Sequence, residues 1–124
     1  MPKQPIMADT AAAPGGAYSH AIVAGAFVFL AGCTPTRPDG TQVRGPFLEQ
    51  AAAAFDNLEA VARAAGCTLA DAVRVGVYLV DNGDFAAMNE LYRERFPEPL
   101  PARTTIQSNL PGFAIEVDAV LFKG

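Results

Sequence analysis

Lysine is scarce in this chain. Among 124 residues there are two lysines, Lys3 and Lys123, and both lie within three residues of a terminus. An enzyme that forms a Schiff base needs a lysine whose pKa is depressed by desolvation in a pocket, and chain termini rarely supply one. Covalent imine catalysis through lysine is therefore nearly excluded.

Histidine and cysteine are also scarce. The single histidine, His20, rules out a histidine cluster for metal within one chain, and Cys33 and Cys67 are far apart with no metal-ligand spacing. No glycine-rich phosphate loop, nucleophile elbow or nucleotide fingerprint occurs. We therefore expect no metal and no cofactor, and we expect the cysteines to be small buried hydrophobes in a reducing compartment rather than a disulfide.

Positive charge is in deficit. Thirteen acidic residues against nine basic ones give a net charge of −4, which repels phosphate backbones and argues against a nucleic-acid partner. No apolar run reaches the length of a membrane span, and the N-terminus lacks a signal pattern. With 51% hydrophobic residues, the composition predicts one folded, cytoplasmic domain with no membrane partner.

Periodicity predicts an α+β domain over residues 17–124, preceded by a loose, flexible N-terminal arm over residues 1–16. Two helices are expected to cover one face of a sheet. In chain order, the first expected elements are a buried strand within 21–32 with a turn at Gly25, a turn at 37–40, and a helix at 46–65 with Leu48 on its apolar face and Gly66 after it. A strand at 73–79 follows, with Val73 on its apolar face, and then a helix that starts at Phe85, is capped by Asp84 and is ended by Pro97. The last two expected elements are strands at 104–107 and 114–122.

The last strand predicts an oligomer. Its alternation places apolar side chains on one face, while the other mixes two carboxylates, Glu116 and Asp118, with Val120 and Phe122. If the helices cover the first face, the second leaves apolar surface in water. Such surfaces usually mark interfaces, so we expect the sheets of several copies to face inward.

Arg103 is the most informative cation. It follows Pro101 at the start of a strand, where a stiff backbone would hold its guanidinium as a fork for a carboxylate. An ordinary ion pair with Glu116 or Asp118 on a neighbouring strand is an equal alternative. For His20, a packed or surface role is favoured over a place in a site.

Eight short segments together carry a family resemblance through their order and spacing. They are AYSHA (17–21), FVFLAG (27–32), NLEAV (57–61), AAGC (64–67), VYLVD (77–81), FAAMNELY (85–92), PARTT (101–105) and IEVDAV (115–120). By these segments the chain, from about Gly16 to Val120, resembles the RidA/YjgF family of small trimeric imine deaminases.

The resemblance implies a chorismate-mutase-like α+β fold, with a mixed sheet, two helices on one face, and three copies forming a barrel with clefts between subunits. It implies a hydrolase acting on C=N bonds, which converts enamine and imine acids such as 2-aminoacrylate and its imine tautomer to 2-keto acids and ammonia. A trimer of the same family that binds small carboxylates or keto acids without turnover is the alternative. A ribonuclease activity is disfavoured by the charge and by the lack of paired histidines.

The resemblance also assigns residues by position. It implies that Arg103 binds the substrate carboxylate, that Glu116 positions or deprotonates water, that Tyr18 lines the cleft and that Asn89 adds a polar contact.

Two further positions are candidates for substrate contact. Cys33 and Thr105 stand where the family often has glutamine and cysteine. Cys33 falls where the implied cleft wall should be, and inert packing is favoured for it over a substrate contact. Asp118 is the alternative carboxylate to Glu116.

Overall fold

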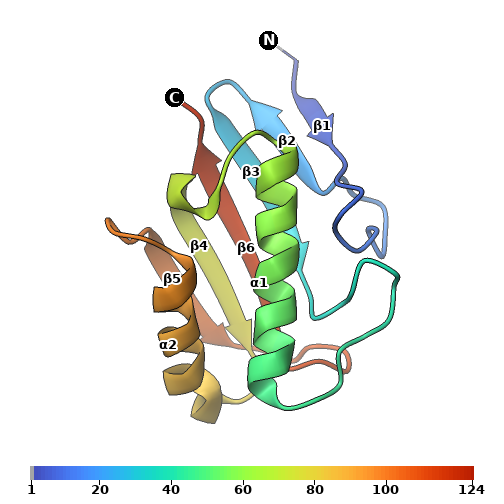
Figure 1. Cartoon of the computed structure of the whole chain (residues 1–124), viewed down its shortest axis with the longest axis vertical. Coiled ribbons are helices and arrows are strands. Elements are labelled where there is room, and N and C mark those ends of the chain that lie inside the picture. The colour runs from blue at the N-terminus through green and yellow to red at the C-terminus, as the bar shows by residue number, and fades with distance from the viewer. Residues whose placement is uncertain (1) are drawn as a thin grey trace.

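A six-stranded mixed sheet carries both helices on one of its faces (Figure 1). The structure, a computed structural model, describes residues 2–124. The strand order is β1-β2-β3-β6-β4-β5; β4 and β5 pair in parallel, and the other neighbours are antiparallel. This confirms the predicted fold class. The elements are β1 (Gln4–Ile6), β2 (Ala21–Ala24), β3 (Phe27–Cys33), α1 (Phe47–Ala64), a 3₁₀ turn (Leu69–Asp71), β4 (Ala72–Leu79), a second 3₁₀ turn (Asn82–Asp84), α2 (Phe85–Arg95), β5 (Ala102–Gln107) and β6 (Ile115–Phe122).

Helix α1 forms where the sequence predicts it. Pro46 precedes its first residue, and Gly66 follows its end at φ +79°, a left-handed conformation that glycine adopts without strain. Phe55 and Leu58 are fully buried against the sheet. The prediction for Leu48 is wrong: its side chain is 52% exposed, because burial along the helix starts one turn later, at Ala51.

The strand predicted within residues 21–32 is two strands. The turn at Gly25 lies inside the segment and joins β2 to β3 as a hairpin. Val28 and Leu30 are buried, whereas Phe27 and Phe29 are exposed. A hydrophobic run on a strand alternates between faces, so half of this run points away from the core.

Strand β4 buries Val75, Val77 and Leu79, as its alternation predicts. Val73, expected on the same face, is exposed instead. The cause is a register irregularity between Ala72 and Arg74 where β4 pairs with β6, since an extra residue in one strand turns the preceding side chains to the other face.

Helix α2 starts after Asp84, but the Asp84 side chain makes no capping hydrogen bond. Instead, the Asp81 carboxylate accepts from the N–H of Gly83 (2.8 Å) and caps the preceding 3₁₀ turn. Met88 and Tyr92 are buried, while Phe85 is largely exposed.

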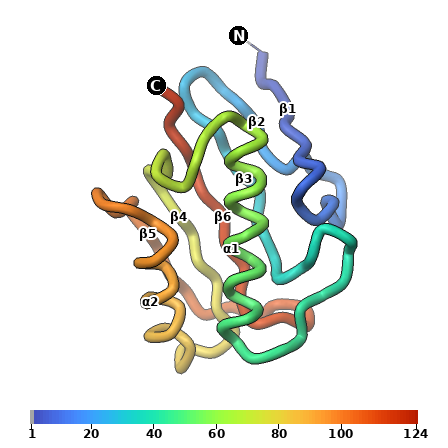
Figure 2. The backbone as a smooth tube through the Cα atoms, viewed as in Figure 1, coloured from blue at the N-terminus to red at the C-terminus, as the bar shows by residue number. Residues whose placement is uncertain are grey.

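The N-terminal stretch joins the sheet, although the sequence predicts a loose arm there. Backbone pairing with β2 holds β1 in place (Figure 2), and the side chains of Ala8 and Ala11 are buried. Met1 lies outside the described residues.

The face of the sheet opposite the helices is uncovered in the single chain. Ile115, Val117, Ala119 and Leu121 point toward the helices and are buried. The open face presents large apolar side chains, 41–47% exposed: Phe27, Phe29, Ile106 and Phe122. Neither helix in the described part of the chain combines the length and apolar character that a bilayer span requires.

Candidate functional site

The larger cavity, of about 790 Å³, lies beyond the C-terminal end of β3. Its walls come from the N-terminal loop, the loop after β3, helix α1 and the loop that leads into β6. Three of the predicted site residues line it: Tyr18, Cys33 and Glu116. Tyr18 is half-exposed, and its hydroxyl accepts from the N–H of Gly15 at 3.0 Å.

Glu116 has a carboxylate with free acceptor capacity. Strand β6 directs it to the open side of the sheet, against the backbone of β3, where a methyl group on Gly32 would overlap it. Among residues 2–124 its side chain has no hydrogen-bond partner, and burial followed by the charge of Asp118 raises its pKa. A carboxylate with a raised pKa is a better base for water.

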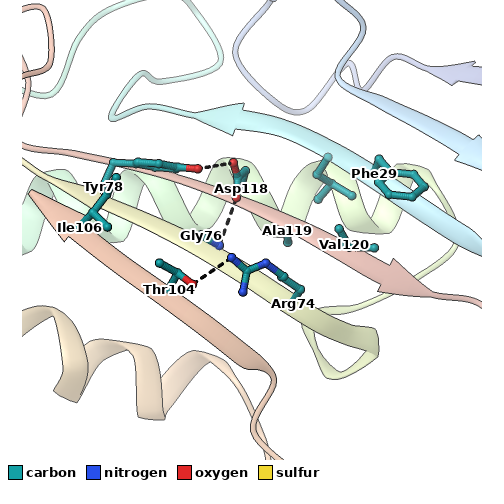
Figure 3. Close-up of a pocket in the computed structure, with 10 residues that line it drawn as sticks. Phe29, Arg74, Gly76, Tyr78, Thr104, Ile106, Asp118, Ala119 and Val120 are labelled. Carbon is teal, nitrogen blue, oxygen red and sulfur yellow. Dashed lines mark hydrogen bonds between the residues drawn. The ribbon is translucent and has the colours of Figure 1, made fainter. Parts of the chain in front are cut away.

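Asp118, the alternative carboxylate, is already engaged (Figure 3). Its Oδ1 accepts from the N–H of Gly76 (3.1 Å) and its Oδ2 from the hydroxyl of Tyr78 (3.0 Å). It lines a second cavity of about 370 Å³ on the open face, where Arg74 donates to Thr104 (2.9 Å). Glu116 is therefore the better candidate.

His20 is a structural residue at the edge of the larger cavity. Its Nδ1 accepts from the N–H of Ala8 (2.8 Å), and its Nε2 lies 2.7 Å from the carbonyl oxygen of Ala12. These contacts require the neutral tautomer with hydrogen on Nε2, and they occupy both ring nitrogens. The packed role favoured from the sequence matches this arrangement.

Asn57 organises the cavity walls, a role that sequence reasoning missed. From the buried side of α1, its Nδ2 donates to the carbonyl oxygens of Thr34 (3.0 Å) and Thr36 (2.6 Å), and its Oδ1 accepts from the N–H of Ala12 (3.2 Å). The available signal was an amide at helical spacing between two apolar residues, Ala54 and Val61.

Asn57→Ala is expected to destabilise the fold. It removes three hydrogen bonds and leaves their backbone partners unpaired, at a cost of about 3 kcal/mol. Urea unfolding at matched protein concentration measures this cost, and Asn109→Ala, at an exposed position, is the control. If the two variants unfold at the same urea concentration, the organising role is wrong.

Cys33 is buried, and its pKa is raised to about 12 by burial first and then by Glu116 and Asp118. Its thiol lies 3.7 Å from the carbonyl oxygen of Ala31. The thiolate is the nucleophile and the metal ligand, so the neutral thiol at this wall is a small apolar surface. No group of three or more potential metal-ligating side chains occurs within residues 2–124.

We expect Cys33 to resist alkylation. A thiol with a pKa of about 12 is ionised in roughly one molecule in 10⁴ at pH 8. In a Cys67→Ala background, iodoacetamide should label native protein at least about a hundredfold more slowly than free cysteine, whereas protein unfolded in guanidinium should label at the free rate. Fast labelling of the native protein would contradict this environment.

Arg103 lies on β5, an edge strand of the sheet, and packs against α2. Its guanidinium carbon is 4.5 Å from the ring centroid of Tyr92 and 5.5 Å from that of Phe85, and its Nη1 is 4.0 Å from Sδ of Met88. The alternative of an ion pair with a carboxylate of β6 is wrong. In the described chain, the ion pairs join Arg63 to Glu59 and Arg95 to Asp56.

Asn89 and Thr105 lie in the neighbourhood of Arg103. Steps of four and three along α2 place Asn89 between Phe85 and Tyr92 on one helical stripe. Thr105 shares the Arg103 face of β5, and its hydroxyl is buried without a partner among residues 2–124. A buried unpaired hydroxyl is costly, so this position would gain from a polar ligand.

The predicted site residues therefore form two separate groups. Arg103, Asn89 and Thr105 lie at the β5–α2 edge, on the side of the sheet that the helices cover. Glu116 belongs to β6, which lies between β3 and β4 inside the sheet (Figure 1), and its side chain faces the open side. One chain does not bring Arg103 and Glu116 to a common small ligand.

Comparisons with known proteins agree with this fold. The family model described as Endoribonuclease L-PSP matches residues 8–122. A RutC family protein of Pyrococcus horikoshii is 43% identical over 98% of each chain. The human protein named 2-iminobutanoate/2-iminopropanoate deaminase is 37% identical over 94% of this chain and 88% of its own. The crystal structure of RidA from the Antarctic bacterium Psychrobacter sp. aligns with a TM-score of 0.92 at 37% identity, over 96% of this chain and 98% of that one.

Proposed function

Because this chain belongs to the RidA/YjgF family, which the Endoribonuclease L-PSP family model describes, we propose that it hydrolyses 2-imino acids and their enamine tautomers to 2-keto acids and ammonia. The observation that carries the proposal is Arg103, a guanidinium held on aromatic rings and unpaired with any carboxylate of residues 2–124. Such a group is suited to bind a substrate carboxylate through two charge-assisted hydrogen bonds. The human relative named as an imine deaminase supports the same chemistry.

The site would form between copies. The Arg103 group lies at the β5 edge on the side that the helices cover, whereas Glu116 faces the open side and lines the larger cavity beyond the end of β3 with Tyr18 and Cys33. A head-to-tail contact would bring the β5 edge of one copy beside the larger cavity of the next. Repeated contacts of this kind close a ring. We propose a ring of three copies, which would cover the exposed apolar side chains of the open face, such as Phe29 and Ile106.

The proposed reaction needs no covalent intermediate with the protein. Arg103 holds the substrate carboxylate, and Glu116 of the adjacent copy takes a proton from water as the water oxygen adds to the electrophilic imine carbon. Glu116 returns this proton to the imine nitrogen, which gives the aminoalcohol. The hydroxyl proton then passes to nitrogen through the same carboxylate as the C–N bond breaks and the C=O bond forms, and ammonia leaves. Positioning of the two reactants supplies much of the acceleration.

The remaining predicted residues shape this cleft. Asn89 and the unpaired hydroxyl of Thr105 would provide polar contacts beside the carboxylate. Tyr18 and the neutral Cys33 thiol would form the wall opposite.

The structure favours an imine over RNA as the substrate. RNA cleavage by general acid–base chemistry usually needs titratable side chains free to move protons, and both nitrogens of His20 are occupied by backbone groups. A net charge of −4 also opposes binding to phosphate backbones. Because Cys33 and Cys67 are both free and buried, we place the reaction in the reducing cytoplasm.

The test generates imines from several amino acids with an amino-acid oxidase and traps them with semicarbazide. Wild-type protein should speed the loss of trapped signal, and Arg103→Ala should not. No acceleration with any imine would overturn the proposal. If 2-ketobutyrate then still binds in an Arg103-dependent way, the protein is a carboxylate-binding module instead.

A further inference from the structure

We propose that Tyr92 is a positioning residue for carboxylate binding, because its ring sets the direction of the Arg103 guanidinium, with Phe85 as a flanking support. This inference rests on the role of Arg103 in the proposed function. Tyr92 reaches no ligand itself: it is 3% exposed and lies within the core.

The ring of Tyr92 is fixed from several directions. Phe96 stacks on it with a centroid separation of 4.4 Å, and Phe55 meets it edge-on at 6.2 Å. The Arg103 guanidinium carbon is 4.5 Å from the same centroid. Two groups this close to one centroid cannot share a face, so the guanidinium takes the face that Phe96 leaves free. The platform is therefore anchored in the core and cannot follow the arginine if the arginine moves.

An arginine needs such support because its side chain is long and rotatable. Binding a carboxylate with two parallel hydrogen bonds requires the guanidinium plane to be aligned before the ligand arrives. Stacking on an immobile ring removes rotational freedom in advance and adds a cation–π attraction. Phe85, 5.5 Å away at the exposed end of α2, limits movement on the solvent side.

The ring of Tyr92, and not its hydroxyl, performs this role. The hydroxyl is buried without a hydrogen-bond partner among residues 2–124, and burial raises its pKa while the charge of Arg103 opposes that rise. Removing the hydroxyl therefore breaks no hydrogen bond in the described chain. Tyr92→Phe keeps the platform, whereas Tyr92→Leu removes it and keeps an apolar side chain.

The test measures binding of 2-ketobutyrate by calorimetry in the assembled protein. Tyr92→Phe should bind within about twofold of wild type, and Tyr92→Leu about tenfold more weakly. In an Arg103→Ala background, Tyr92→Leu should cause no further loss, since it acts through Arg103. With imine substrates, Tyr92→Leu should raise KM about tenfold while kcat changes less than about threefold.

Phe85→Leu covers the case in which Tyr92→Leu does not fold. Phe85 is exposed, so its replacement leaves the core intact and should weaken 2-ketobutyrate binding about threefold. The inference is overturned if a folded Tyr92→Leu binds like wild type, or if Tyr92→Leu does not fold and Phe85→Leu binds like wild type. It is also overturned if Tyr92→Phe loses as much as Tyr92→Leu, or if wild type does not bind 2-ketobutyrate. If wild type binds it but turns over no imine, the proposed function alone fails.

Discussion

Arg103→Ala is expected to lower kcat/KM for 2-imino acids by at least about a hundredfold. Two charge-assisted hydrogen bonds of about 1.5–3 kcal/mol each are lost with the guanidinium, and every 1.4 kcal/mol is tenfold in rate. The side chain contacts α2 and forms no ion pair within the described residues. Its removal should therefore leave the fold intact, and the oxidase-coupled semicarbazide assay measures the loss.

Arg103→Lys separates charge from geometry. Lysine keeps the positive charge but has neither the planar fork nor the flat surface that stacks on Tyr92, so this variant should recover little of the lost rate. Arg63→Ala is the matched control, because Arg63 forms an exposed pair with Glu59 one turn earlier on α1. Full activity in Arg103→Lys would show that charge alone suffices and would contradict the bidentate role.

The sequence predicted elements well where one face is buried and the other is not. In α1 and β6, periodicity alone identifies the core face, because burial of that face is the dominant energy. The errors occur where this logic weakens. Leu48 precedes the part of α1 that meets the sheet, and Val73 lies within the register irregularity between Ala72 and Arg74, which turns its side chain to the other face. The hydrophobic pattern shows neither where a helix begins to contact the sheet nor where a strand contains a bulge.

The N-terminal stretch shows a different limit. Short strand β1 has weak apolar character, and its place in the sheet depends on backbone pairing with β2 and on His20 and Asn57, which accept from the N–H groups of Ala8 and Ala12. Contacts of this kind join residues far apart in the chain, so local pattern does not reveal them.

The candidate residues were predicted individually, but their grouping was not. Strand β5 has no buried face of its own: Ala102, Thr104 and Ile106 are exposed, and Arg103 and Thr105 are half-buried. Without an apolar face, alternation does not say which side of the sheet Arg103 occupies. The aromatic support under Arg103 was also invisible, because Phe85 and Tyr92 at helical spacing predict an ordinary core face.

This separation makes the site itself testable by mixing two inactive variants. Arg103→Ala lacks the guanidinium that binds the substrate carboxylate, and Glu116→Gln lacks the base. Removal of the base alone should lower the rate about 10²–10⁴-fold. In a head-to-tail ring, a site takes Arg103 from one copy and Glu116 from the next. A Glu116→Gln copy followed by an Arg103→Ala copy therefore contains one intact site, although neither variant alone forms any.

Equal mixing, by co-expression or joint refolding, should restore about one quarter of wild-type activity, because each of the two neighbours at a site has the needed residue half of the time. This value holds for a ring of any size, so it tests the shared site independently of the number of copies.

Mixing Arg103→Ala with a Tyr92→Leu, Arg103→Ala double variant should restore nothing, since no copy then supplies the guanidinium. If the first mixture also stays inactive while subunit exchange is confirmed by differently tagged copies, each site lies within one chain. The distance between the β5 edge and the larger cavity would then have to close by a rearrangement of the sheet, which the continuous hydrogen bonding from β1 to β5 opposes.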